Sequence, residues 1–405
     1  MVADTAEKSN APKIRMSELD GLRALAILFV MAFHSWYFLH YTLPSMEVFL
    51  EFSDSLPWIF GFIRRGDLGV DIFFVLSGYL LAWQLFRKRM KTGEIRVKSF
   101  YAHRIFRIYP LYLVALGLAA IDVGITTDML GNLLGYNIWT TPANIIIPWT
   151  WSLSVELEFY AIVPLLILLI RSGKDLAIMT TVIVLFTIGW NYWILSSYPQ
   201  IATHSFIDLL LNGRGDDSST FYHLLYIAMP ARISQFTLGM AGAWIVLNRS
   251  AFLAELSKKT VTILTILIVL GAAFPLTYNP FTIVSGWPAS IIFYEILLGR
   301  TIFAAAIALM IVLLHAGRLP TLKRVLSSRL LEPVARYSFS MYLFHPIFVY
   351  LGVVAFVGLD KVPTVSILQY IGVAIITLTG SMLTGWITWR FIEGPAIRFG
   401  RKHFR

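Results

Sequence analysis

The segment Leu19–Tyr41 reads LDGLRALAILFVMAFHSWYFLHY, and it decides the fold class of this chain. Its residues that are charged at neutral pH, Asp20 and Arg23, stand near its start, and almost all the others are apolar or aromatic. A helix that crosses the hydrocarbon core of a bilayer needs about 20 mostly apolar residues. The segment therefore predicts a transmembrane helix. The polar residues before it lack the short apolar region and cleavage site of a signal peptide, so we expect the segment to stay in the membrane.

The composition of the whole chain extends this expectation to the rest of the sequence. The 405 residues are 57% hydrophobic, 15% aromatic and 14% charged, and the mean hydropathy is +0.71. A soluble domain averages roughly 45–50% apolar and about 25% charged residues. These values exclude a soluble globular protein and a disordered chain. The sequence has no cysteine, which also excludes disulfides, thiol nucleophiles and Cys-ligated zinc.

Ten segments have the length and apolarity of membrane spans, so the sequence predicts an all-α, polytopic membrane helical bundle. The segments are Leu19–Tyr41, Leu68–Phe86, Ile108–Val123, Trp151–Ile170, Leu176–Leu195, Ile227–Leu247, Val261–Leu276, Arg300–Leu314, Tyr337–Val357 and Val365–Phe391. No internal repeat divides the chain. We therefore expect a disordered N-terminal tail (1–16), one transmembrane domain (17–397) and a C-terminal tail (398–405).

The distribution of lysine and arginine predicts the orientation of this domain. Ten spans put both termini on one side of the membrane. If that side is the cytoplasm, most of the lysines and arginines fall in cytoplasmic segments, above all 87–107, 318–336 and the C-terminal tail. Cytoplasmic loops carry such an excess. We expect a multi-pass protein of the cell (inner) membrane with both termini cytoplasmic, and we assign the net charge of +10 to topology, not to nucleic-acid binding.

Two ionisable residues, Arg23 and His34, lie in the first predicted span, where such a side chain is a functional candidate. They are eleven residues apart, about 20° beyond three full helical turns, so they share one face of the helix. Their separation along the axis is roughly 16 Å. His34 is a candidate proton acceptor near neutral pH. The alternatives are a snorkelling anchor for Arg23 and a packing role for His34.

A basic stretch before the third span, SFYAHRIFRIYP (99–110), is a candidate site for an anionic ligand. Arg104 and Arg107 are three residues apart, so on a helix they share a face and can bind one phosphate-bearing ligand together. The alternative is ordinary anchoring at the membrane surface, including contact with anionic lipid. The arginines and Tyr101 stand at the membrane surface and lead into a span, which favours a ligand site.

The fourth span begins with WTWSLSVELEFY (149–160) and carries two carboxylates into the membrane. Glu156 and Glu158 point about 200° apart on a helix, so only one of them easily faces His34. Glu156 and His34 both fall in the outer half of the predicted bilayer. A carboxylate there orients an imidazole and stabilises its charged form, so we expect Glu156 to orient His34.

Smaller signals add the remaining candidate site residues. They are Asp71 at the outer mouth of the second span, Ser77 within that span, Trp151 and Ser152 at the start of the fourth, and Tyr342 and His345 in the ninth. We expect Ser77-Gly78-Tyr79 to interrupt the second span and Pro346 to free a backbone carbonyl in the ninth. The sequence has no zinc-helix histidine pair or Gly-rich phosphate loop, and no metal site is predicted.

Six blocks in order resemble the acyltransferase 3 family, which consists of multi-pass membrane O-acyltransferases. They are LDGLRA (19–24), His34, GVDIFFVLSGYL (69–80), FYAHRIFRIYP (100–110), WSLSVE (151–156) and YSFSMYLFHP (337–346). The resemblance extends over nearly the whole chain. The sequence departs from the family at one point: the family often has two adjacent acidic residues after WSLSV, whereas Glu156 is followed here by Leu157 and Glu158.

The resemblance implies an enzyme without a tightly bound cofactor that uses acyl-CoA, usually acetyl-CoA, as a co-substrate from the cytoplasmic side. Its acceptor is the hydroxyl of a carbohydrate or glycolipid at the membrane or its outer face. Arg104 and Arg107, with Tyr101, then hold the CoA phosphates, and the pantetheine arm passes Arg23 to reach His34. His34 acts as general base or as the site of a transient acyl-enzyme; the sequence does not separate these routes.

Two other classes of function stay open at this point. A transporter that exports an acylated or anionic metabolite also combines many spans with buried charge, although the sequence has no matched pair of broken helices in its two halves. A structural subunit of a polysaccharide synthase leaves His34 and the two arginines without a role. The acceptor of an acyltransferase stays open as well, and a macrolide or another small metabolite fits as well as a glycan does.

Overall fold

The computed structural model describes residues 16–404, apart from 141–143, 205, 207–208, 210–212, 277–288 and 359–361. Apart from residue 16, the predicted N-terminal tail lies outside the described residues. The described chain is helical without strands, which confirms the all-α class.

Ten long helices form the body of the protein. They are α1 (Ser17–Tyr37), α3 (Leu68–Thr92), α4 (Val97–Val123), α6 (Trp151–Leu169), α7 (Gly173–Ser197), α10 (Met229–Asn248), α12 (Lys258–Ala273), α14 (Arg300–His315), α16 (Leu331–Phe356) and α17 (Ile367–Thr388). The described residues also form seven short α-helices: α2 (Met46–Ser55), α5 (Asp128–Leu134), α9 (Gly215–Thr220), α11 (Ser250–Ala254), α13 (Ala289–Tyr294), α15 (Pro320–Leu326) and α18 (Gly394–His403).

Several elements depart from α-helical geometry. The 3₁₀ turns are η1 (Phe38–Tyr41), η2 (Trp58–Arg65), η3 (Asn137–Trp139), η5 (Pro148–Thr150) and η7 (Phe274–Leu276). Three π-helical segments are η6 (Phe221–Ile227), η8 (Glu295–Gly299) and η9 (Trp389–Glu393). Such segments are rare and are frequent at functional sites.

Eight helical segments of the described chain are long and apolar enough to cross a membrane. This finding agrees with the predicted multi-pass bundle, although the sequence analysis expected about ten spans. The two predicted spans that do not meet the same criteria correspond to α10 and α12. α12 has 16 residues, fewer than the bilayer thickness requires. α10 buries polar side chains, among them Arg232 and Gln235, which lower its hydropathy.

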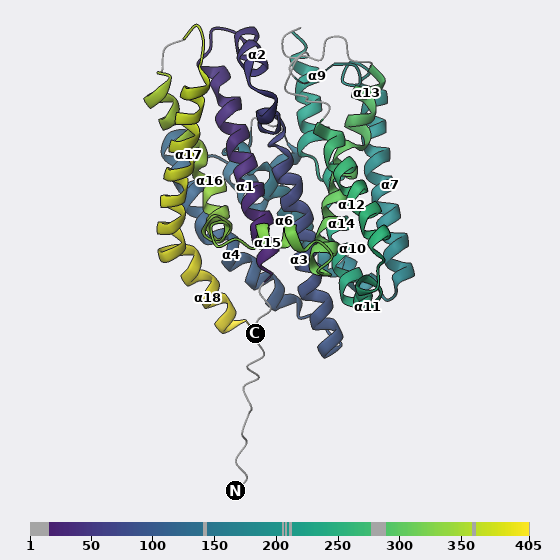
Figure 1. Ribbon diagram of the computed structural model, residues 1–405. Coiled ribbons are helices and arrows are strands. Elements are labelled where there is room, and N and C mark those ends of the chain that lie inside the picture. The colour runs from purple at the N-terminus through teal and green to yellow at the C-terminus, as the bar shows by residue number, and fades with distance from the viewer. Residues whose placement is uncertain are drawn as a thin grey trace.

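The long helices pack side by side, with α1, α3 and α6 near the centre (Figure 1). α1 packs between α16 and α3, α10 packs on α3, α7 and α14, and α17 covers α16. The start of α1 and the end of α18 lie at the same end of the bundle, called here the terminal end (Figure 1). α2, α9 and α13 lie at the opposite end (Figure 1).

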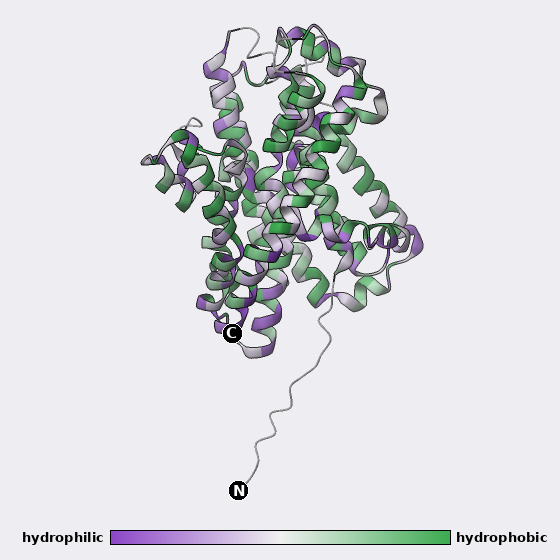
Figure 2. Cartoon of the chain, turned by 90° about the vertical axis from the view of Figure 1, so that its left-hand side faces the viewer, coloured by the Kyte–Doolittle hydropathy of each residue, from purple (hydrophilic) through white to green (hydrophobic). Residues whose placement is uncertain are grey.

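The sides of the bundle are apolar, as expected for a surface in contact with lipid. Figure 2 shows hydrophobic residues along the helices and hydrophilic ones gathered mostly toward the two ends. On α7, the side chains of Ile178, Val182 and Leu185 are each more than half exposed. They follow the spacing of one helix face. Soluble proteins rarely expose an apolar stripe of this kind.

The helices α3 and α10 approach each other through glycine. A Cβ atom on Gly78 would lie 2.0 Å from the carbonyl oxygen of Phe236, and one on Gly239 would lie 2.1 Å from that of Val75. Small residues permit this kind of backbone approach in membrane bundles. α3 runs unbroken through Ser77-Gly78-Tyr79, so the predicted interruption is wrong. The glycine serves helix packing and does not break the helix.

Gly78→Ala is expected to lower the free energy of unfolding by about 1–3 kcal/mol, because the new methyl group forces α3 away from α10. The measurement is thermal unfolding of the purified protein in detergent. Gly189→Ala is the matched control, because a Cβ on Gly189 of α7 meets nothing within 4 Å. That substitution is expected to leave stability unchanged or raise it slightly. A Gly78→Ala variant as stable as the control would contradict the close packing.

Candidate functional site

A pair of histidines joins α1 to α16 inside the bundle. The Nδ1 atom of His34 lies 2.6 Å from the Nε2 atom of His345, and their rings stack with centroids 4.8 Å apart. His345 is fully buried, whereas His34 is partly exposed. His345 is the one hydrogen-bond partner of the His34 side chain among the described residues. The second ring nitrogen of His34, Nε2, therefore makes no hydrogen bond with a described residue.

A proline next to His345 explains how that ring is held. Pro346 lies inside α16 and has no N–H to donate to the carbonyl of Tyr342, one helical turn earlier. The Nδ1 atom of His345 lies 2.9 Å from this carbonyl oxygen and 3.0 Å from that of Met341. The structure thus agrees with the predicted free carbonyl and adds that the histidine uses it.

The start of α6 is fastened to the same part of α16. The Tyr342 hydroxyl donates to the carbonyl of Trp149 and lies 2.7 Å from the Ser152 hydroxyl. The Trp149 indole N–H donates to the carbonyl of Leu343 at 3.0 Å. We call His34, His345, Tyr342, Ser152 and Trp149 the histidine site. The structure therefore brings together four predicted site residues: His34, Ser152, Tyr342 and His345.

Glu156 has different partners from those expected. Its carboxylate accepts hydrogen bonds from the Ser77 hydroxyl at 2.5 Å and from the Tyr160 hydroxyl at 2.6 Å. The expected contact with His34 is therefore not present: a second imidazole, not this carboxylate, lies against the ring. Glu158 accepts from the Trp139 indole and is not part of this group.

Three predicted arginines gather toward the terminal end of the bundle. Arg104 on α4 lies over the Tyr160 ring at 5.9 Å, and its Nε atom is buried with no hydrogen-bond partner in the described chain. Arg23 pairs with Asp20 at 3.2 Å, and the charges of Arg107 and Glu156 both act on it. We call Arg23, Arg104 and Arg107 the arginine cluster.

Tyr101, the fourth residue expected to bind the donor, is tied to the protein backbone. Its hydroxyl donates to the Ala161 carbonyl at 3.0 Å, which links α4 to α6. The residue thus positions α4, the helix that carries Arg104 and Arg107. Within the described residues, no group of three or more histidine, aspartate or glutamate side chains is placed to hold a metal ion.

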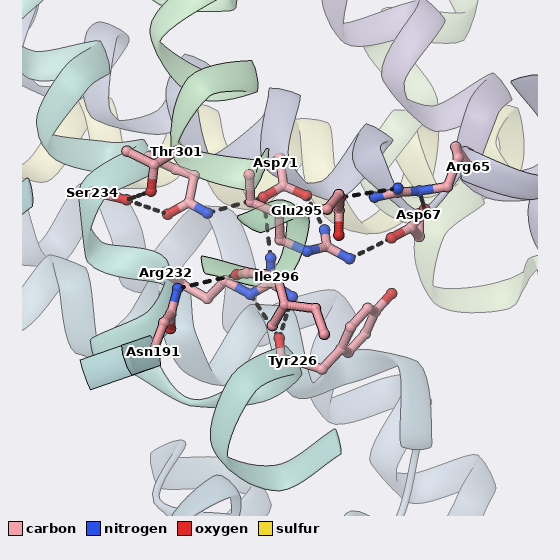
Figure 3. Close-up of polar contacts among 12 residues, drawn as sticks. Arg65, Asp67, Asp71, Asn191, Tyr226, Arg232, Ser234, Glu295, Ile296 and Thr301 are labelled. Atoms are coloured by element: carbon pink, nitrogen blue, oxygen red, sulfur yellow. Dashed lines mark hydrogen bonds and ion pairs between the residues drawn. The ribbon is translucent and has the colours of Figure 1, made fainter. Parts of the chain in front are cut away.

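Asp71, another predicted residue, belongs to a buried network of ion pairs beside the start of α3 (Figure 3). The network consists of Arg65, Asp67, Asp71, Arg232, Glu295 and Arg300, three arginines and three carboxylates. Arg300 bridges Asp67 and Asp71, with both contacts at 2.5 Å. Asp71 is fully buried and also accepts from Arg232 at 3.1 Å. We call these six residues the ion network.

The ion network balances the charges that burial makes costly. Burial alone would raise the pKa of the Asp67 carboxyl, but Arg65 and Arg300 outweigh this effect and hold its pKa below the usual range. Arg65 also pairs with Glu295 at 3.2 Å. Because each arginine pairs with a carboxylate, the network as a whole has no net charge and links the helices that carry its members.

The ion network reaches the start of α6 through aromatic rings. The guanidinium of Arg232 lies 5.4 Å from the Trp151 ring centroid and 5.0 Å from that of Tyr226. Arg300 lies 4.9 Å from the same Tyr226 ring. Contacts of this geometry are favourable cation–π interactions. Trp151 is therefore placed in the structural network, next to but not within the histidine site.

Comparison with known proteins agrees with the resemblance of the sequence blocks. Residues 16–386 match the family described as "Acyltransferase domain". The chain belongs to the acyltransferase 3 family. No solved structure matches it.

Two relatives of this acyltransferase 3 chain are named as O-acetyltransferases. It is 27% identical, over 98% of its length, to the O-acetyltransferase OatA of Staphylococcus aureus (strain NCTC 8325 / PS 47). It is 24% identical, over 94% of its length, to the peptidoglycan O-acetyltransferase OatA of Listeria monocytogenes. The chain spans 60% of the first relative's length and 56% of the second's.

Of the ion network in this acyltransferase 3 chain, only Asp71 was expected from the sequence as a site residue. A signal for the others was present, because Arg232 and Glu295 are ionisable residues in or beside apolar segments. Their partners, Asp71 for Arg232 and Arg65 for Glu295, could not be predicted from the sequence, since they lie far away along the chain and Glu295 stands in the π-helical segment η8.

Asp71→Asn is expected to lower the free energy of unfolding by about 3–5 kcal/mol, because it leaves buried arginine charge without its partner. Asp54→Asn is the control: Asp54 pairs with Arg64 at 3.2 Å, but its side chain is 74% exposed, so its loss is expected to cost less than about 1 kcal/mol. Chemical unfolding of both purified variants measures the difference. Equal stability of the two variants would show that the network does not hold the fold.

Proposed function

We propose that this chain is a membrane O-acyltransferase that moves an acyl group, in the first instance acetyl, from acyl-CoA to a hydroxyl of a carbohydrate acceptor. The observation that carries the proposal is the free ring nitrogen of His34, on the same helix as Arg23 of the arginine cluster. Membership of the acyltransferase 3 family supports the reaction class. The names of the two OatA relatives support acetyl as the group, and the name of the Listeria relative, a peptidoglycan O-acetyltransferase, supports a cell-wall carbohydrate as the class of acceptor.

The arginine cluster is the proposed site for the phosphates of the donor. Arg104 keeps a buried Nε atom without a hydrogen-bond partner in the described chain, and the charge of Arg107 acts on Arg104. An arginine with a free donor in a low-dielectric surrounding binds phosphate strongly, because guanidinium–phosphate hydrogen bonds are short and charge-assisted. Lysines and arginines are frequent at this end of the bundle, which supports a cytoplasmic location for it and for both termini. The donor then enters from the cytoplasm.

The proposed reaction needs one proton acceptor at the histidine site. The acceptor hydroxyl gives its proton to the free nitrogen of His34 while its oxygen attacks the thioester carbonyl carbon. The new C–O bond forms, the C–S bond breaks, and the CoA thiolate leaves with the proton from His34 as the free thiol. If His34 attacks first, the acetyl group rests on the imidazole before the hydroxyl takes it.

Glu156 acts in this proposal through the arginines. Its negative charge acts on Arg23 and Arg104, and Tyr160 lies between the carboxylate and the Arg104 guanidinium. The carboxylate thus orients the side chains past which the pantetheine arm reaches His34. In this proposal Glu156 orients arginine side chains, whereas the sequence led us to expect that it orients the imidazole of His34.

His34→Ala is expected to lower acetyl transfer by about 10²–10⁴-fold, the usual contribution of a general base. The assay supplies radiolabelled acetyl-CoA, which does not cross membranes, to inside-out vesicles and follows free CoA and labelled glycan. Right-side-out vesicles are expected to be inactive, because the donor site faces the cytoplasm. His403→Gln, at an exposed position on α18, is the matched control.

Label on the protein without acceptor, lost in His34→Ala, would assign the acyl-enzyme route. Turnover that does not depend on His34 would refute the proposed base. If wild-type vesicles release no CoA and transfer no acetyl group, the acyltransferase proposal fails.

Substitution of both Arg104 and Arg107 by alanine is expected to raise the KM for acetyl-CoA by about 10²–10⁴-fold, since one charge-assisted hydrogen bond from each arginine contributes about 1.5–3 kcal/mol. The KM for S-acetylpantetheine, which has no phosphate, should not change. Lys98→Ala removes an exposed charge from the same basic stretch and is the control. Glu156→Gln should also raise the KM for acetyl-CoA. An unchanged KM in the double variant would indicate that the arginines only anchor the helix to lipid.

A further inference from the structure

We propose that His345 is a positioning residue that decides which ring nitrogen of His34 is free to accept a proton, and that Pro346 makes this possible. The inference rests on the proposed function, because it assumes that His34 is the base. It assigns one task to two residues that neither bind the donor nor touch the reacting atoms.

The first step concerns the proton on His345. Its Nδ1 atom lies 2.9 Å from the carbonyl oxygen of Tyr342 and 3.0 Å from that of Met341. A carbonyl oxygen only accepts hydrogen bonds. Nδ1 must therefore carry the proton, and the neutral ring has its lone pair on Nε2. Pro346 strengthens this arrangement, because an amide N–H at this position would compete for the Tyr342 carbonyl.

The second step carries this assignment from one ring to the other. The Nε2 atom of His345 and the Nδ1 atom of His34 are 2.6 Å apart, a hydrogen-bond distance that requires one proton between them. Because Nε2 of His345 has none, the proton is on Nδ1 of His34. In a neutral pair, the lone pair of His34 must then be on Nε2. The free nitrogen identified above is thus held in the form that can act as a base.

The third step explains why an imidazole suits this place better than a carboxylate. When Nε2 of His34 takes a proton, the Nδ1–H of His34 continues to donate to Nε2 of His345. The positively charged imidazolium of His34 therefore keeps a hydrogen-bonded neighbour. Before the reaction the pair carries no charge, so no desolvated ion has to be balanced inside the membrane. The stacked rings, inclined by 14°, and the attachment of Tyr342 to the start of α6 hold the geometry.

Three substitutions test the roles of His345 and Pro346 separately. His345→Gln keeps an acceptor near the position of Nε2, whereas His345→Asn keeps only a donor near that of Nδ1. Pro346→Ala keeps the histidine but returns an N–H to the helix, which competes for the Tyr342 carbonyl. Pro164→Ala, which restores an N–H inside α6, is the matched control.

We expect His345→Asn to lower kcat by about 10³–10⁴-fold, as found where a base loses its correct tautomer, and Pro346→Ala to lower it by about ten- to a hundredfold. His345→Gln should keep most of the activity, and the KM for acetyl-CoA should be unchanged in all three. In ¹⁵N-histidine NMR of the protein in nanodiscs, wild-type His34 should be protonated on Nδ1 and not on Nε2. His345→Asn should show both tautomers.

Wild-type kcat in His345→Asn, or protonated Nε2 in neutral wild-type His34, would overturn the inference. The NMR measurement also tests the histidine inference separately from the proposed function. If the wild-type protein gives the expected NMR pattern but transfers no acetyl group, the tautomer assignment is supported and the acyltransferase proposal is refuted. A variant whose kcat falls because the protein unfolds is recognised by the loss of its histidine NMR signals. Pro164→Ala shows how much activity is lost when a proline is replaced elsewhere in the bundle.

Discussion

The structure depends on one constraint: charge inside a membrane bundle must meet opposite charge. The hydrocarbon region offers no water to an unpaired ion, so the cost of an isolated buried group is several kcal/mol. The ion network meets this constraint with equal numbers of arginines and carboxylates, drawn from η2, α3, α10 and the η8–α14 segment. It joins elements that are far apart in the sequence, and the Arg232–Trp151 contact extends it to the start of α6.

The arginine cluster is balanced less completely. Arg23 pairs with Asp20, and the charge of Glu156 acts on Arg23 and Arg104, but Arg104 keeps a buried donor atom without a hydrogen-bond partner in the described chain. A phosphate-bearing anion would satisfy that donor, and acyl-CoA, the donor in the proposed function, has this character. In that proposal, the same chain uses arginine for stability in the ion network and for binding in the arginine cluster.

The histidine site is positioned by the backbone as much as by side chains. Pro346 removes one hydrogen bond from α16, the freed carbonyl of Tyr342 lies against Nδ1 of His345, and Nε2 of His345 lies against His34. The close contact of α3 and α10 at Gly78 has a similar origin, because the absence of a side chain allows a specific approach. In both places the geometry depends on a group that the residue lacks: the amide N–H in Pro346 and the side chain in Gly78.

The sequence by itself determined the helical, multi-pass class, the family and most of the candidate residues. These properties follow from local features: the length of apolar runs, the position of ionisable residues within them, and the order of short blocks. Even the role of Pro346 was visible, because a proline acts on its own helix turn. Only the tertiary structure decided which residues the candidate side chains contact. His34 contacts His345 and not Glu156, and Asp71 belongs to the ion network and not to the histidine site. Helix periodicity states which face a residue occupies, but the neighbour of that face is set by helix packing and by π-helical turns, which have no local signature in the sequence.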